Sequence, residues 1–295
     1  MANLRDVRLR MRAIKQTLQV TKAMNLISTA KLRKGRRILE DTEPFFTRIQ
    51  KSMYDIVSGT GVLESEFFKN TEEVTGSQSA VVVVTSDKGL AGGYNANIFR
   101  QAMRICENLS KPVLILIGSI GYRYFAHTSY AILENFSFKS QLPTMEDAQE
   151  ITDYIISQYV WGIFKEVHIV YTHMYSAVKL LPRTRQILPL QGEKIQEDIA
   201  QSGGQKRVRI PFEYIPSETA VVDALVPFYI KGIIYGSLVE AYVSEQNARM
   251  AAMEEASKNA QEMLESLQIY YNRVRQASIT QEVTEIISGS AVLSE

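Results

Sequence analysis

The sequence is short of the residues that carry most enzyme chemistry. It has a single cysteine, Cys106, and three histidines in 295 residues. One cysteine excludes an internal disulfide framework and fits a reducing compartment. His127, His168 and His173 stand at no metal-ligand spacing, and the last two would face opposite sides of a strand. We therefore expect no metal, no cofactor and no catalytic residue in this chain.

Long apolar runs and a charge excess are also missing. The longest apolar runs, Val81–Val84 and Val113–Ile117, have the length of strands, well below the ~20 residues of a membrane span. The net charge of +1 indicates neither a nucleic-acid nor a membrane partner. No Gly-x-Ser-x-Gly, Cys-x-x-Cys or His-Glu-x-x-His motif occurs, so conventional catalysis has no candidates.

The first 37 residues are basic, with Asp6 as their only acid. A mitochondrial transit peptide can be as basic, but such peptides are rich in serine, and the first serine here is Ser28. The apolar periodicity of the segment also continues beyond a cleavable length. We therefore interpret this segment as part of the folded protein.

Both ends of the chain are predicted to be long helices. Near the N-terminus, alternating spacings of three and four define the a/d seam of a left-handed coiled coil. The seam consists of Leu4, Val7, Met11, Ile14, Leu18, Thr21, Asn25, Ser28 and Leu32. Pro44 is expected to interrupt this helix, which resumes to about Val57. At the other end, Glu218 to Ser288 predicts a helix roughly 100 Å long.

A helix of that length needs a partner, because helical stability in proteins comes mainly from packing. The first helix runs from the N-terminal end into the middle of the chain, and the last runs from the middle to the C-terminal end. We therefore expect the two to pair antiparallel. Their charges are complementary, because the first helix is basic and the last has an acidic set. That set is Glu240, Glu245, Glu254, Glu255, Glu262 and Glu265. A nucleic-acid-binding arm is the alternative for the basic helix, but no aromatic residues interleave with its bases.

The middle of the chain alternates strand and helix patterns. Strands are predicted at 80–85, 112–117, 130–133, 166–172 and 186–190. Thr144 to Asp147 has the sequence of a capping box that opens a helix burying Ile151, Ile155 and Tyr159. This alternation predicts a compact, mostly parallel, Rossmann-like α/β domain. The expected division is 1–59 and 216–289 for the coiled-coil helices and 77–215 for the domain.

A glycine-rich turn follows the first strand, where α/β proteins often hold phosphates. Its spacing, Gly-x-x-Gly-Gly from Gly89 to Gly93, matches neither the dinucleotide fingerprint nor the P-loop. We interpret it as a tight surface loop in which Asp87 and Lys88 meet a protein partner. A nucleotide-binding enzyme with helical arms stays as an alternative that rests on this turn alone.

Three segments carry a family resemblance. Met1 to Arg37, with Thr21-Lys22-Ala23-Met24, resembles the start of the gamma subunit of F-type ATP synthases. Ser86-Asp87-Lys88-Gly89-Leu90 is similar to a loop of that family's central domain. Ser244-Glu245-Gln246 and the run from Arg275 to Glu282 resemble its C-terminal signature. The segments come in the family's order and extend over essentially the whole chain.

The resemblance implies a rotary shaft that makes no bonds itself. The coiled coil would stand inside a ring of alpha and beta subunits, with the domain at its foot beside epsilon and the membrane-embedded c-ring. Rotation driven by protons or sodium ions would drive the catalytic beta subunits through their conformations for ATP synthesis or hydrolysis. The resemblance does not identify the ion. It also implies a peripheral protein on the cytoplasmic face of a bacterial cell membrane.

The same resemblance assigns contacts residue by residue. Arg275, Gln276, Thr280 and Glu282 would meet beta-subunit loops around the upper shaft, and Lys22, Met24 and Arg249 a beta-subunit loop at its middle. Tyr214 and Glu218 would lie at the foot, near the c-ring. The apolar tip residues Ile286, Ile287, Val292 and Leu293 would turn in an apolar bearing. A lone Cys106 cannot form the dithiol switch of chloroplast-type relatives. A coiled-coil scaffold or adaptor with an α/β head is the remaining alternative.

Overall fold

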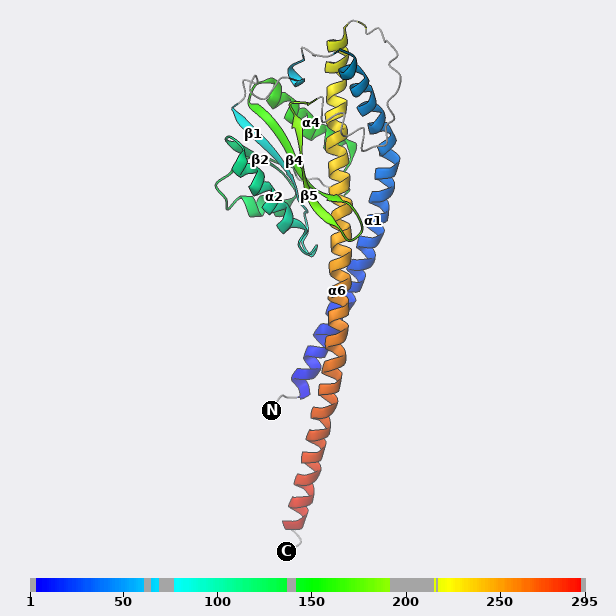
Figure 1. Cartoon of the computed structure of the whole chain (residues 1–295). Coiled ribbons are helices and arrows are strands. Elements are labelled where there is room, and N and C mark those ends of the chain that lie inside the picture. The colour runs from blue at the N-terminus through cyan, green and yellow to red at the C-terminus, as the bar shows by residue number, and fades with distance from the viewer. Residues whose placement is uncertain are drawn as a thin grey trace. The chain divides into compact units, whose positions relative to one another are not determined.

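The computed structural model describes residues 4–60, 65–68, 77–136, 142–191, 215 and 217–292. The chain divides into two compact units. One joins Met1–Thr29 to Arg249–Glu295, and the other is Ala30–Ala248. The two long helices, α1 (Leu4–Thr60) and α6 (Glu218–Val292), contribute a segment to each unit (Figure 1).

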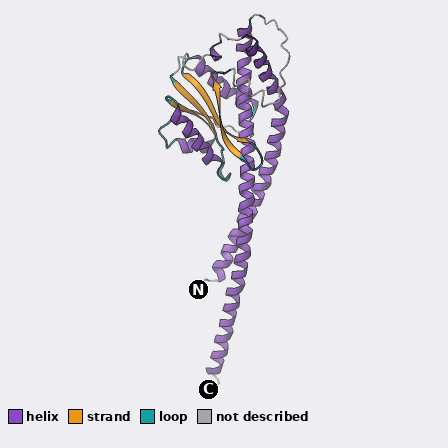
Figure 2. Ribbon diagram, in the orientation of Figure 1, coloured by secondary structure: helices purple, strands orange, loops and turns teal. Residues whose placement is uncertain are grey.

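The second unit contains one five-stranded sheet in the order β3-β2-β1-β4-β5 (Figure 2). Its strands are β1 (Gln78–Val84), β2 (Pro112–Ile117), β3 (Ala131–Phe136), β4 (Phe164–Met174) and β5 (Leu180–Leu188). β1 to β4 are parallel, and β5 runs antiparallel to β4. The predicted fold class, a mostly parallel α/β domain with two long terminal helices that pack together, is confirmed. The fifth strand begins earlier than expected, because a tight hairpin returns the chain directly from β4.

The order of the strands explains the layers. From β1 through β2 to β3 the chain moves one way across the sheet, by way of α2 (Tyr94–Asn108) and α3 (Ser119–Phe125). From β3 to β4 it moves back past β1, by way of α4 (Met145–Val160). Because such crossovers are right-handed, reversing the direction puts α4 on the opposite face from α2 and α3. A 3-10 turn, η1 (Glu66–Phe68), precedes the sheet in sequence.

Local sequence signals explain how α4 starts. The Thr144 hydroxyl accepts a hydrogen bond from Asp147 N, and the Asp147 carboxylate accepts one from Thr144 N. The predicted capping box is therefore confirmed, as is the burial of Ile151, Ile155 and Tyr159. α3 has only seven residues, too few for a periodicity that the sequence could reveal.

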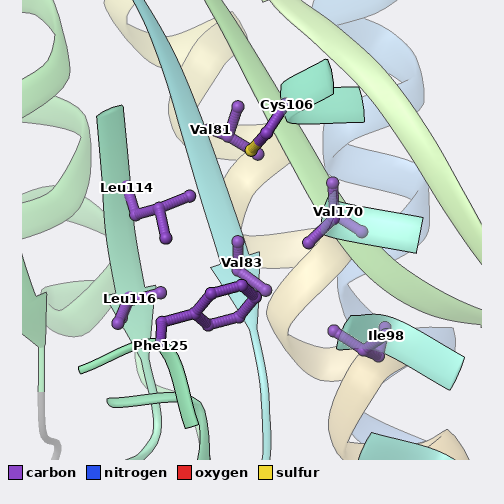
Figure 3. Packing of buried hydrophobic residues seen from close by; sticks show 9 residues of the cluster. Val81, Val83, Ile98, Cys106, Leu114, Leu116, Phe125 and Val170 are labelled. Carbon is purple, nitrogen blue, oxygen red and sulfur yellow. The ribbon is translucent and has the colours of Figure 1, made fainter. Parts of the chain in front are cut away.

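One core cluster fills the space between the sheet and α2 with α3 (Figure 3). Its buried members are Val81, Val83, Ile98, Ala102, Cys106, Leu114, Leu116, Phe125 and Val170. Cys106 is a packed core residue, as expected, and burial raises the pKa of its thiol to about 11. The thiol therefore stays protonated and unreactive at neutral pH.

The first third of α6 is the most apolar stretch of the chain. One window of 18 residues has a mean hydropathy of 1.4, which by composition suffices to span a membrane. The expectation that every apolar stretch is only strand-sized was therefore wrong. Of that window, 56% is buried inside the structure, so packing within the unit accounts for its composition.

Two glycines permit close packing of α1 and α6 in this unit. A Cβ on Gly35 would lie 2.8 Å from Val243 Cγ2, and one on Gly232 would lie 2.4 Å from Phe46 Cδ1. Close by, α1 continues through Pro44, so the predicted interruption there was wrong. Proline removes one backbone donor, and we attribute the helix's continuity to packing of this segment against α6 through Phe46.

The first unit is an antiparallel helix pair. Every seam residue up to Ser28 is buried or half-buried, which confirms the predicted seam. Hydrogen bonds join Arg8 to the Tyr271 hydroxyl (2.7 Å), Ser257 to Thr21 (2.7 Å) and Asn25 Nδ2 to the Met250 carbonyl (3.1 Å). Residue numbers rise along α1 as they fall along α6, so the predicted antiparallel pairing is confirmed.

Four of the acidic residues predicted to pair with the basic helix do not do so. Within the described part of the chain, no ion pair joins α1 to Glu254, Glu255, Glu262 or Glu265, all of which are exposed. Glu240 instead contacts His173 of β4. Exposed ion pairs gain little in water. Hydrogen bonds do cross this unit's helix pair, and one of them uses Arg8.

Candidate partner-contact surfaces

The end of α6 extends past its partner helix. Tyr271 bonds to Arg8 near the start of α1, and α6 then continues alone (Figure 1). From Arg275 to Ile287 every side chain except that of Ser278 is exposed. The segment is therefore a helix whose surface is almost entirely available.

An apolar stripe follows one face of this unpaired segment. Ile279, Val283 and Ile286, spaced four and three apart, are 51%, 48% and 71% exposed, and the neighbouring Ile287 is 64% exposed. Such spacing lines one side of a helix, and contiguous exposed apolar surface commonly marks a protein interface. The stripe is suited to contact with another protein.

The predicted polar contact residues lie on the same segment. Arg275, Gln276, Thr280 and Glu282 are all exposed. The Thr280 hydroxyl donates to the Gln276 carbonyl (2.9 Å), and Glu282 accepts from Ser278 at 3.3 Å. Their side chains make only such local contacts, which leaves them accessible to a partner. Of the predicted apolar tip, Ile286 and Ile287 are exposed, whereas the side chains of Val292 and Leu293 lie outside the described residues.

The second predicted contact group lies where α1 and α6 meet. Lys22 is exposed and Met24 is half-buried, beside the hydrogen bond from Asn25 to Met250. Arg249 lies in the same region, and only 8% of it is exposed. In the isolated chain its side chain is covered by its own neighbours and is unavailable as a broad contact surface.

The loop after β1 is held by its own chain. Asp87 Oδ1 accepts a hydrogen bond from Ser119 N (2.9 Å), and the Ser119 hydroxyl donates to the Asp87 carbonyl (2.9 Å). The Asp87 carboxylate thus binds the start of α3 within the chain. Lys88 is exposed, as a partner contact requires.

Two glycines that the sequence did not explain, Gly118 and Gly121, pack against Thr85 just before this loop. Gly118 has a φ of +94°, and a Cβ there would lie 2.4 Å from the Thr85 carbonyl oxygen. The Thr85 hydroxyl donates to the Ile117 carbonyl (2.8 Å) and accepts from Gly121 N (3.0 Å). These contacts fix the end of β1 against the turn that follows β2. The glycines therefore serve packing.

The crevice where this fold class usually binds nucleotides is occupied by α6. In doubly wound sheets, ligands lie at the carboxyl ends of the strands where the strand order reverses, here β1 and β4. The Tyr94 hydroxyl, at the start of α2, donates to the Ala241 carbonyl (3.2 Å). The Ser244 hydroxyl donates to the Thr172 carbonyl on β4 (3.0 Å). The chain's own helix fills the place of a ligand, which argues against the nucleotide-binding alternative.

The predicted foot contacts are only partly described. Glu218 is exposed in the first turn of α6, directly after Ser217, whose hydroxyl accepts from Ala220 N at 3.2 Å. Tyr214 lies outside the described residues. In the same region Ser65 donates to Asp223 (2.6 Å), which joins the turn before the sheet to α6.

The antiparallel helix pair, the sheet domain bound to α6 and the exposed helix end together define a class, the coiled-coil stalk subunit of a larger assembly. A family model described as ATP synthase matches residues 3–293. The chain is 44% identical over 292 residues to the ATP synthase gamma chain of Ruminiclostridium cellulolyticum, with 99% of each chain covered. The chain belongs to the ATP synthase gamma-chain family and is a rotor stalk subunit, a non-catalytic part of a membrane-bound enzyme.

Solved structures show the same fold. One is a chain of the Euglena gracilis mitochondrial ATP synthase, in a structure of its OSCP, F1 and c-ring. It aligns with a TM-score of 0.69 at 19% identity over 98% of this chain and 94% of that one. Another belongs to the central stalk and c-ring of the Tetrahymena thermophila enzyme. It aligns with a TM-score of 0.60 at 21% identity over 81% of this chain and 99% of that one.

Proposed function

We propose that this chain is the shaft that carries torque between an ion-driven c-ring and the catalytic beta subunits. Residues 1–59 and 216–289 form the shaft, and residues 77–215 form the foot beside epsilon and the c-ring. One charge crossing 100 mV of membrane potential gains ~2.3 kcal/mol, so a few ions deliver on the order of 10 kcal/mol for each catalytic event. The chain itself contributes no catalytic residue.

The unpaired end of α6 is the observation that carries this proposal. A helix that exposes an apolar stripe after its intramolecular partner has ended requires another surface to cover it. A ring of alpha and beta subunits around the shaft supplies that surface. Arg275, Gln276, Thr280 and Glu282 then bond to beta-subunit loops, while Ile279, Val283 and Ile286 turn against apolar walls.

The remaining contacts follow from exposure and charge. Lys22 and Met24 meet an acidic beta-subunit loop, and the covered Arg249 supports the helix surface beside them. Lys88, Tyr214 and Glu218 face epsilon or the c-ring, whereas Asp87 holds the loop that presents Lys88. The protein is peripheral, on the cytoplasmic face of a bacterial membrane, and reaches the membrane only through the c-ring.

ATP synthesis in inverted membrane vesicles tests the proposal. Arg275→Ala should lower coupled synthesis several-fold and leave the unfolding free energy within about 0.5 kcal/mol, because the side chain is exposed. Arg273→Ala, a matched change of an exposed arginine two residues away, should stay within about twofold of wild type. Equal effects of the two substitutions would contradict the assigned contact.

A further inference from the structure

One face of α6 is fastened to the hairpin that joins β4 to β5. Glu240, Ser244 and Asn247, spaced four and three apart, all lie on this face. Glu240 Oε1 contacts His173 Nδ1 near the end of β4. Ser244 donates to the Thr172 carbonyl (3.0 Å), and Asn247 Nδ2 donates to the Ala177 carbonyl in the turn (2.7 Å). Three side chains along one face of α6 thus contact the same hairpin.

The first of these fastenings is an ionisable pair. The side chains of His173 and Glu240 are only 24% and 19% exposed. Burial raises the pKa of Glu240 to about 7, and burial together with nearby Arg183 lowers the pKa of His173. Each group thus resists its own charge, which favours the uncharged form of both side chains.

Charged and titratable groups surround the pair from every packed element. From β4, Tyr171 bonds to Glu240, and the Met174 backbone also bonds to it. From β5, Arg183 and Arg185 act on Glu240 through their charge. From α1, Arg36 lies 4.0 Å from Met174 Sδ, while the neighbouring Arg37 and Glu40 are exposed. The positive charges of Arg183 and Arg185 favour the ionised form of Glu240, but they do not offset the effect of its burial.

We propose that Glu240, Ser244 and Asn247 form a clamp that locks the α/β domain to α6 through the β4–β5 hairpin, and that the contact between Glu240 and His173 keeps this clamp closed near neutral pH. The clamp occupies the crevice where related folds bind ligands. A rotor needs its foot and its shaft to turn as one body, and a fastening in that crevice meets this need. This consequence rests on the proposed function, whereas the clamp itself does not.

The two partners have opposite pH dependences. The raised pKa of Glu240 gives stability that is present below its unfolded pKa of about 4.5 and is lost as pH rises through about 7. The lowered pKa of His173 gives stability that is present above 6.5 and is lost as pH falls. In the intact pair the two trends oppose each other, so hairpin opening should change little with pH.

Hydrogen exchange of the hairpin in the assembled enzyme tests the clamp. Peptides covering residues 172–181 are compared between about pH 5 and 7.5, corrected for intrinsic exchange. His173→Gln should open the hairpin more as pH rises, by about tenfold or more across the range, because Glu240 then titrates alone. Glu240→Gln should open it more as pH falls, and wild type should vary by less than about threefold.

Two further variants serve as controls. Glu254→Gln changes an exposed carboxylate of the same helix and should behave as wild type. Ser244→Ala removes one fastening that does not titrate and should raise exchange equally at every pH. Parallel pH slopes in His173→Gln and Glu240→Gln would overturn the role given to the contact between Glu240 and His173, and unchanged exchange in Ser244→Ala would overturn the clamp.

The ratio of coupling ions pumped to ATP hydrolysed, measured on the same preparations, separates the clamp from the proposed function. A lowered ratio in Ser244→Ala supports both. Opposite exchange slopes in the two pair variants, with a ratio equal to wild type in all of them, would leave the clamp standing and contradict only its place in the torque path.

Discussion

Two regions of the same helix are built in opposite ways. Between Val222 and Val243, α6 is apolar and mostly buried within its unit, with Ile230 and Ile234 fully covered. Between Arg275 and Ile287, it is again rich in isoleucine and valine, yet these side chains are exposed. Composition alone cannot distinguish the two regions. Burial does, because the chain packs other segments against the first region and leaves the second exposed.

We expect the buried region of α6 to contribute to stability and the exposed region to contribute to function. Substitutions in the buried region should change the free energy of unfolding. Substitutions in the exposed region should leave that free energy nearly unchanged and act on coupling. Each of the following predictions pairs a change in a packed environment with a matched change in an exposed or open one.

The largest difference is expected between two isoleucines. Ile234→Ala should lower the unfolding free energy by about 2–5 kcal/mol, because it removes a fully buried side chain and leaves a cavity. Ile286→Ala, at a site 71% exposed, should change it by less than about 0.5 kcal/mol. Urea unfolding of the full chain measures both. Similar losses at the two sites would break the comparison.

Two glycines of α6 should respond in opposite directions. Gly232→Ala should destabilise by about 1–3 kcal/mol, because its Cβ would lie 2.4 Å from the Phe46 ring. Gly236→Ala should stabilise by about 0.5–1 kcal/mol, since its Cβ would meet no described atom within 4 Å beyond its own stretch of helix, and alanine favours the helix. Thermal unfolding reports both shifts. A stabilising Gly232→Ala would show that the two helices are less closely packed than described.

The polar seam of the first unit should have an intermediate effect. Asn25→Ala should cost about 1 kcal/mol, because it removes a hydrogen bond to the Met250 carbonyl across the pair. Thr17→Ala removes only a bond to its own helix, at Ala13, and should cost less than about 0.5 kcal/mol. Urea unfolding of the two variants compares them. Equal costs would mean that the interhelical bond does not contribute.

The smallest effect concerns acid stability. Burial alone would raise the pKa of Glu166, but hydrogen bonds from His168 and Ser79 lower it overall. This stability is present above the unfolded pKa of about 4.5 and is lost as pH falls through the lower folded value. Glu166→Gln should therefore flatten the loss of stability below about pH 4.5, whereas the exposed Glu254→Gln should not. Unfolding titrations between pH 3 and 7 measure both, and identical acid limbs would contradict the assignment.

Local features could be predicted from the sequence because each depends only on the spacing of residues within one segment. The a/d seam from Leu4 to Ser28, the parallel strands and the capping box at Thr144 are of this kind. The partner contact proposed at Arg275–Glu282 comes from the family resemblance, and the segment is exposed apart from Ser278.

Features that depend on contacts between segments far apart in the sequence could not be predicted. The exposed Glu254 and Glu262 looked like partners for the basic helix, yet only the tertiary structure decides which groups they meet. The fit of Gly232 against Phe46 and the filling of the sheet's crevice by α6 likewise arise between segments far apart in sequence. No local pattern reports either.

A thiol placed on the exposed end of α6 tests the central claim most directly. Cys106 is buried, with the pKa of its thiol raised to about 11, so the wild-type chain reacts little with maleimide at neutral pH. Ile286→Cys should label rapidly in the isolated chain, at a rate close to that of Val178→Cys, a position 94% exposed. In the assembled ATPase, labelling of Ile286→Cys should slow by about tenfold or more as partner subunits cover it. An unchanged rate on assembly would contradict the claim that this helix end works against a surrounding ring.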